Sequence, residues 1–254
     1  MSVIGVVSMK GGVGKTSVTA NLAAALASKL GEGRVSLIDL DPQNGLQWHL
    51  GLNAQEEEGI CEYSVDSPNL RRLLRPSEFG VACLTYGVGA ESDREAFEAL
   101  LEAEPAWLRE QIKRAGLSRD AVVLIDTPPG ASVYQKQVFS CADLLLIVVL
   151  ADAGSYATIP AMETSLDEVS GVYPRLASVY LLNQVDRSES LNRDVADMLQ
   201  GHLGKRLIPF GIHSDPAVSE ALAFQQPVLI YDPHGQASHD IARLASWVID
   251  TINQ

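Results

Sequence analysis

The feature that most constrains the fold is a glycine-rich loop near the N-terminus, with the sequence Ser8-Met9-Lys10-Gly11-Gly12-Val13-Gly14-Lys15-Thr16-Ser17. An apolar run, residues 3–8, leads into it, and an alanine-rich stretch with helical spacing, residues 15–30, follows it. A strand, a glycine-rich turn and a helix in this order form the setting that a phosphate-binding loop requires. The loop therefore predicts an α/β fold whose first strand ends at an anion site.

Each residue type in this loop has a chemical reason to be there. Glycines let successive backbone N–H groups turn inward around a phosphate, and the following helix adds its positive N-terminal end. The lysine supplies a cation for the β- and γ-phosphates, the threonine hydroxyl can ligate Mg²⁺, and Ser17 is placed to meet the α-phosphate. We therefore predict nucleotide contacts from Gly11, Gly12, Val13, Gly14, Lys15, Thr16 and Ser17. The alternative, a glycine-rich turn beside a surface lysine, does not explain why motif and flanking elements agree.

Carboxylates follow two further apolar runs. Asp39 and Asp41 end the run at residues 35–39, and residues at i and i+2 of a strand point the same way. Asp126 ends the apolar run before Thr-Pro-Pro-Gly, as in a Walker B strand whose carboxylate binds Mg²⁺ through water. We expect Gly130 to let its backbone N–H approach the γ-phosphate of a bound nucleotide. The alternative for Asp41-Pro42 is a plain turn at a strand end.

Apolar runs alternate with helical patterns along the whole chain. Strands are predicted at residues 3–8, 35–39, 81–86, 121–126, 144–150, 178–183 and 206–209, and helices at 15–30, 94–115, 159–172, 190–203 and 238–252. This alternation predicts one domain, residues 1–254, with a doubly wound and mostly parallel sheet of about seven strands and helices on both faces.

Composition excludes several classes of protein. The longest apolar run, residues 144–151, is too short to span a bilayer, and no basic stretch precedes the first apolar run as in a signal peptide, so we expect a cytoplasmic protein.

The three scattered cysteines predict reduced thiols, two of them buried. A net charge of −13 disfavours polyanion binding without a basic patch, and none is evident. The acidic run at 56–58, within the irregular segment 53–78, predicts a solvated loop, with a partner-binding insertion as the alternative.

The lysine that precedes the glycines indicates a family. Lys-Gly-Gly-Val-Gly-Lys-Thr resembles the deviant Walker A motif of the ParA/MinD superfamily, although Met9 stands where the usual motif begins with glycine. By this resemblance Lys10 reaches the phosphates of a partner's ATP across a homodimer. It also implies that Lys10, Lys15 and Asp41 are catalytic, with Asp41 positioning the attacking water, and that Thr16, Asp39 and Asp126 serve Mg²⁺. The implied activity is slow, Mg²⁺-dependent and regulatory ATP hydrolysis.

The resemblance extends to the rest of the nucleotide. In the superfamily an asparagine directly after an apolar strand bonds adenine, and Asn183 occupies that place. The loop after residue 207 resembles the segment that packs on the base, which implies contacts from Pro209 and Phe210, although Phe210 could equally belong to the core. Asp152 matches a position that contacts the ribose or the neighbouring subunit.

The C-terminal third resembles the BcsQ branch, which is encoded with bacterial cellulose synthase. The features that carry this resemblance are Ile212-His213-Ser214-Asp215, the step Gln226-Pro227-Val228 and the closing Ala245-Ser246-Trp247. It implies a switch that regulates or localises the cellulose synthase machinery, with subunits of that machinery as protein partners and recruitment to the inner membrane or cell pole through them. We assign no catalytic role to His213, because a lone loop histidine is usually a hydrogen-bonding or exposed residue.

Other functions on the same fold are a DNA-partition ATPase, a MinD-type membrane positioner and a metabolic enzyme. From residue 205 onward the basic residues are only Lys205, Arg206 and Arg243, which disfavours nucleic-acid binding. The last predicted helix has an apolar face but no basic face, which disfavours direct membrane insertion. Iron–sulfur relatives carry a cysteine shortly after the Asp126 segment, where this chain has Ala131, Ser132 and Val133.

Overall fold

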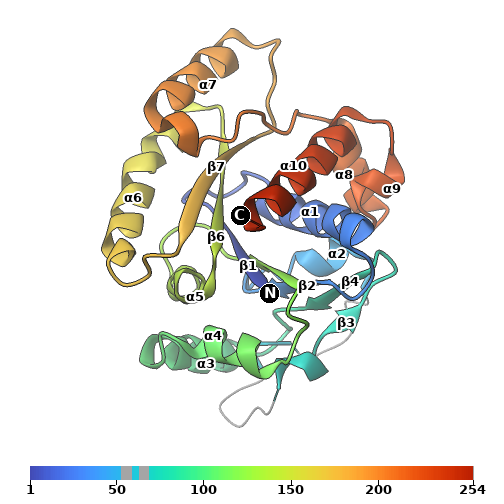
Figure 1. Ribbon diagram of the computed structural model, residues 1–254, viewed down its shortest axis with the longest axis vertical. Coiled ribbons are helices and arrows are strands. Elements are labelled where there is room, and N and C mark those ends of the chain that lie inside the picture. The colour runs from blue at the N-terminus through green and yellow to red at the C-terminus, as the bar shows by residue number, and fades with distance from the viewer. Residues whose placement is uncertain (53–58, 63–68, 254) are drawn as a thin grey trace.

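The computed structural model describes residues 1–52, 59–62 and 69–253, and it is built on one seven-stranded sheet in the order β3-β4-β2-β5-β1-β6-β7 (Figure 1). The strands are β1 (Ser2–Val7), β2 (Val35–Asp39), β3 (Arg75–Pro76), β4 (Val81–Leu84), β5 (Val122–Asp126), β6 (Leu144–Leu150) and β7 (Ala177–Asn183). Every neighbouring pair is parallel except β3 with β4. The predicted fold class is therefore confirmed. The acidic run at 56–58 lies outside the described residues.

Helices cover both faces of the sheet. They are α1 (Lys15–Leu30), α2 (Leu46–His49), α3 (Glu91–Ala103), α4 (Trp107–Arg114), α5 (Val133–Cys141), α6 (Ala153–Ser170), α7 (Ser190–Leu203), α8 (Pro216–Ala223), α9 (Val228–Tyr231) and α10 (Gln236–Ile252), with 3₁₀ turns η1 (Leu70–Arg72) and η2 (Gly204–Arg206). Figure 1 shows α1 and α10 packed side by side on one face, with α3 to α6 on the other.

The alternation of side chains along β1 separates the two halves of the core. Ile4 and Val6 pack with α1 and α10, whereas Val3 and Val7 pack with the helices of the opposite face. β1 lies between β5 and β6, so the chain leaves it toward β2 on one side and later returns to β6 on the other. A crevice opens at such a switch point, and the glycine-rich loop begins there.

Three predicted elements are wrong in detail. The helix predicted at 159–172 begins at Ala153, because Asp152 caps it there. Residues 206–209 form no strand, only an isolated bridge from Leu207 to Tyr180, because Pro209 has no N–H with which to extend a ladder. The predicted helix at 94–115 is two helices, since Pro105 disfavours helical backbone at Glu104, which adopts φ −123° and ψ 80°. The sequence patterns also missed β3, α2, α5, α8 and α9.

The remaining expectations about the chain concern thiols and membranes. The three cysteines are free, with Cys61 and Cys83 buried and Cys141 half-buried, as predicted. Within the described part of the chain, no helix combines the length and apolar character needed to cross a membrane.

Candidate functional site

The glycine-rich loop is hydrogen-bonded to the carboxyl end of β7. Gly12 and Gly14 have φ of 74° and 81°, a left-handed backbone that only glycine adopts readily. The Asn183 side chain donates from Nδ2 to the Val13 carbonyl at 2.8 Å. A Cβ on Gly14 would lie 2.5 Å from that same nitrogen, so glycine is required for the loop to approach β7. Val13, Gly14 and Asn183, all predicted ligands, therefore meet at one place.

Three of the predicted ligand residues converge on the end of β5. The Thr16 hydroxyl donates to Asp126 Oδ2 at 2.7 Å, and the Thr19 hydroxyl donates to Oδ1 at 3.1 Å. Burial raises the pKa of Asp126 to about 6, although Lys15 and the two hydroxyls act in the opposite direction. Lys15 is only 7% exposed, and its ammonium has no ion-pair partner among the residues that the structure describes. A buried ammonium without a direct ion pair, beside an anion-binding loop, is suited to a phosphate.

Asp39 lies directly opposite Asp126 in the register of β2 and β5. It is fully buried, and burial followed by repulsion from Asp126 raises its pKa well above the ordinary value. Its two oxygens accept the backbone N–H groups of Asp41 and Leu46 at 3.0 and 3.1 Å. Asp39 thus also shapes the loop that carries Asp41, whose Oδ1 accepts from the Gln43 N–H at 2.9 Å.

Asn44 completes this loop, and the sequence analysis missed it. It has φ 51°, and its side chain accepts from the Tyr86 N–H at 2.9 Å and donates to the Gly87 carbonyl at 3.2 Å. The only signal in the sequence was an asparagine after Asp-Pro, a residue type that tolerates left-handed backbone. Asn44 fixes the Asp41 loop to the segment that follows β4.

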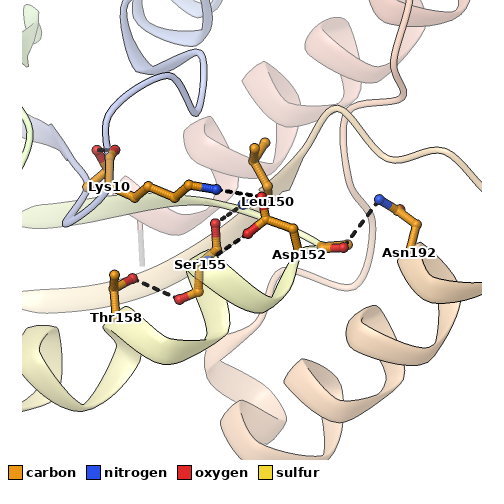
Figure 2. A network of polar contacts seen from close by, with 8 residues as sticks. Lys10, Leu150, Asp152, Ser155, Thr158 and Asn192 are labelled. Carbon is orange, nitrogen blue, oxygen red and sulfur yellow. Dashed lines mark hydrogen bonds and ion pairs between the residues drawn. The ribbon is translucent and has the colours of Figure 1, made fainter.

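Lys10 is paired with an acidic residue of its own chain. Figure 2 shows its ammonium meeting Asp152, with Nζ 2.5 Å from Oδ2. Asp152 caps α6 by accepting the Ser155 N–H at 2.6 Å, and Ser155 in turn accepts the Leu150 N–H. Burial alone would raise the pKa of Asp152, but the hydrogen bonds from Lys10 and Ser155 outweigh it and hold the pKa below its ordinary value. The structure therefore brings together two residues that the sequence left apart.

A hollow of about 280 Å³ opens beside the loop. Its walls come from the glycine-rich loop and α1, the carboxyl end of β7, the segment that leads into α8, and α10. The lining residues are Gly14, Ser17, Val18, Asn21, Asn183, Gln184, Ile212, His213, Ser214, Asp215, Pro216, Val218, Ser219 and Ile241. Its place between the glycine-rich loop and Asn183 suits the nucleoside part of a bound nucleotide. Asn183 lies where a base contact was predicted.

Pro209 and Phe210, the other predicted base contacts, lie elsewhere. Both line a separate hollow with Leu182, Asn192 and Arg193, and the Arg243 guanidinium lies 4.0 Å from the centre of the Phe210 ring. The structure does not bring them to the hollow beside the glycine-rich loop. That hollow is lined instead by residues 212–216, which the sequence marked as distinctive without placing them.

The segment after Asp126 folds back on the start of the loop. Gly130, with φ 84°, donates its N–H to the Ser8 carbonyl at 2.8 Å. The N–H that was expected to approach a phosphate is therefore paired within the chain in this conformation.

Comparison with known proteins agrees with this geometry. The family model for cellulose biosynthesis protein BcsQ matches residues 1–249. The chain belongs to the BcsQ family. It is also 30% identical to the chromosome-partitioning ATPase Soj of Thermus thermophilus over 99% of this chain and 96% of Soj. The identity to BcsQ of Salmonella typhimurium is 28%, over 98% of this chain and 94% of that protein.

Solved structures carry the same fold. The septum site-determining protein MinD of Pyrococcus horikoshii, complexed with Mg-ADP, superposes with a TM-score of 0.74 at 25% identity, covering 97% of this chain and 95% of MinD. A cobyrinic acid a,c-diamide synthase from Mycobacterium smegmatis gives 0.81 at 20% identity, over 100% and 96% of the two chains. This BcsQ-family chain is thus a member of the ParA/MinD-type P-loop ATPases, as the resemblance implied.

The BcsQ-family site also contains a histidine that we expect to control stability at acid pH. His49 is buried next to Ser17, with Nε2 3.4 Å from the hydroxyl oxygen, and burial lowers its pKa from 6.5 to about 4. Between pH 6.5 and 4, His49 is protonated in the unfolded chain but neutral in the folded protein. The free energy of unfolding should therefore be highest above pH 6.5 and fall by up to about 3 kcal/mol as the pH drops to 4.

Urea unfolding from pH 7 to pH 4 measures this loss. The His49→Gln variant should lose less stability than wild type over that interval, whereas His239→Gln, which alters an exposed histidine, should match wild type. Equal losses in wild type and His49→Gln would show that buried His49 does not stay neutral.

Proposed function

We propose that this chain is an ATP-binding, slowly hydrolysing dimerisation switch that regulates or localises the bacterial cellulose synthase and secretion machinery. The observation that carries the proposal is that Lys15, Thr16 and Asp126 converge beside the glycine-rich loop. At Gly14 this loop has no room for a side chain. The match to the BcsQ family over residues 1–249 supports the cellulose branch.

The residues present suit Mg²⁺ and ATP. Thr16 and Asp126 supply adjacent oxygen ligands, the kind that Mg²⁺ prefers, and Asp39 next to Asp126 supports the surrounding shell. When bound, Mg²⁺ supplies positive charge to the phosphate oxygens. The buried Lys15 ammonium holds the β- and γ-phosphates, the hollow beside Gly14 holds the nucleoside, and Asp41 positions the attacking water.

The dimer in this proposal depends on Lys10. Its ammonium must leave Asp152 of its own chain to reach nucleotide bound by a partner, and both side chains are about one-third exposed, at 36% and 37%. A surface ion pair of this kind is weak, so a phosphate group in a desolvated interface can compete for the lysine. ATP then favours the dimer through contacts that ADP cannot supply, which is what makes a switch.

Substituting Lys10 tests the dimer. Light scattering should show wild type dimeric with Mg-ATP and monomeric with Mg-ADP, whereas Lys10→Ala should stay monomeric with both because the trans cation is gone. Lys205→Ala, an exposed lysine away from the loop, serves as the matched control and should behave as wild type. Dimers of Lys10→Ala that form as readily as those of wild type would contradict this role.

A DNA-partition function is the second candidate, and two observations favour it. One is the 30% identity to Soj. The other is the contact between η1, which carries Arg71 and Arg72, and α4, which carries Arg114 and a lysine, Lys113, that is paired with Glu110. The Asn69 side chain donates to the Arg114 carbonyl at 3.1 Å, which joins the two segments. By contrast, the apolar face of α10 is buried against α1, which disfavours a membrane-inserting helix.

Cellulose output separates the two candidates. Deleting the gene in its host should lower the amount of cellulose, measured as glucose released by cellulase. Wild type and Lys205→Ala should restore cellulose when they are expressed in the deletion strain. Lys15→Ala should not restore it, because the cation for the phosphates is lost. Purified protein should not shift generic duplex DNA at physiological salt. Unchanged cellulose after deletion, together with a DNA shift that Arg71→Glu abolishes, would favour partition instead.

A further inference from the structure

His213 lies in the wall of the hollow next to the glycine-rich loop, and a buried carboxylate holds it there. Asp240 of α10 is 7% exposed. Its Oδ2 lies 2.8 Å from His213 Nδ1 and accepts the His213 backbone N–H at 3.0 Å. Gln236 donates to the other oxygen, Oδ1, at 2.9 Å. Backbone and ring of His213 are thus both fixed by one side chain.

This arrangement determines which ring nitrogen carries the proton. An ionised carboxylate only accepts hydrogen bonds, so His213 Nδ1 must be the donor. In the neutral ring, Nε2 then carries a lone pair and is an acceptor. Among the described residues Nε2 has no hydrogen-bond partner, and the side chain is 30% exposed. His213 therefore offers a free acceptor beside the hollow.

Three other polar side chains of the hollow, those of Asn21, Asp215 and Asn183, are already occupied or offer acceptors too. Asn21 donates to the Ser17 carbonyl and accepts from the Val228 N–H. Both oxygens of Asp215 accept backbone N–H groups, those of Ala217 and Ala237. Asn183 uses Nδ2 for the Val13 carbonyl, which leaves its Oδ1 as an acceptor. A base edge that faces His213 and Asn183 is therefore matched better when it presents a donor than when it presents an acceptor.

We propose that His213, oriented by Asp240, is a specificity-determining residue that selects adenine over guanine. Its Nε2 accepts a hydrogen bond from the exocyclic amino group of adenine. Guanine carries a carbonyl oxygen at that position, so two acceptors would face each other with neither satisfied, a mismatch that discriminates strongly. Asp240 is the positioning residue that keeps the accepting tautomer. The inference rests on the proposed function, because it assumes that the hollow holds the base of a nucleotide.

Three variants test this role, because they should change the affinities for ATP and GTP in different directions. Calorimetric titration at pH 8 with Mg-ATP and Mg-GTP should show that wild type prefers ATP by at least about tenfold. His213→Leu should lose about tenfold in ATP affinity, because the acceptor is replaced by an apolar group. In His213→Gln the amide can present either group, so GTP should bind more tightly while ATP affinity changes little. Asp240→Ala removes the acceptor that holds the proton on Nδ1, which frees the other tautomer and should also improve GTP binding.

Asp250→Ala is the matched control, since it removes an exposed carboxylate on the same helix and should leave both affinities unchanged. An increase in GTP affinity is a gain that mere loss of packing would not produce. Wild type that lacks a preference for ATP, or an unchanged ratio of the two affinities in all three variants, would overturn the role of His213. Wild type that binds neither nucleotide would instead contradict the proposed function itself.

Discussion

The hydrogen bond from the Thr16 hydroxyl to Asp126 ties the first turn of α1 to the carboxyl end of β5, and the rest of the site is arranged around it. The same carboxylate also accepts from Thr19, one turn further along α1. The glycine-rich loop leaves β1 at the carboxyl end of the sheet, next to the end of β5, and leads directly into α1. The loop, its lysine and the neighbouring strand ends are therefore placed by the sheet topology, not by the loop alone.

This arrangement brings together carboxylates that repel one another. Asp39 and Asp126 face each other in register, and both are fully buried. Burying two such groups is costly unless a cation or hydrogen bonds compensate, which explains why burial raises the pKa of both. The chain compensates in part with backbone N–H groups on Asp39 and hydroxyls on Asp126. The remaining negative charge next to Lys15 fits our proposal that the site works with Mg²⁺ and a polyphosphate.

Local signals in the sequence were sufficient for most of the fold and for the residues that gather around the glycine-rich loop. Lys15, Thr16, Asp39 and Asp126 stand at strand ends or in a contiguous motif, where residue type and spacing indicate their surroundings. What could not be predicted depends on contacts between distant segments. The pairing of Lys10 with Asp152 spans 142 positions, and that of His213 with Asp240 joins a loop to the last helix. The strand predicted at residues 206–209 is wrong for a local reason instead, because Pro209 has no N–H to donate to a ladder.

We propose that ATP holds the dimer together until it is hydrolysed, and the lifetime of that dimer tests this proposal most directly. Wild type and Asp41→Ala would each be mixed with a limited amount of Mg-ATP and followed by light scattering until the nucleotide is consumed. Our account predicts that both dimerise, that wild type returns to monomer as ADP accumulates, and that Asp41→Ala remains dimeric because it no longer positions the attacking water. Dimers of equal lifetime in the two proteins, or dimers that persist in wild type after all ATP is gone, would contradict it.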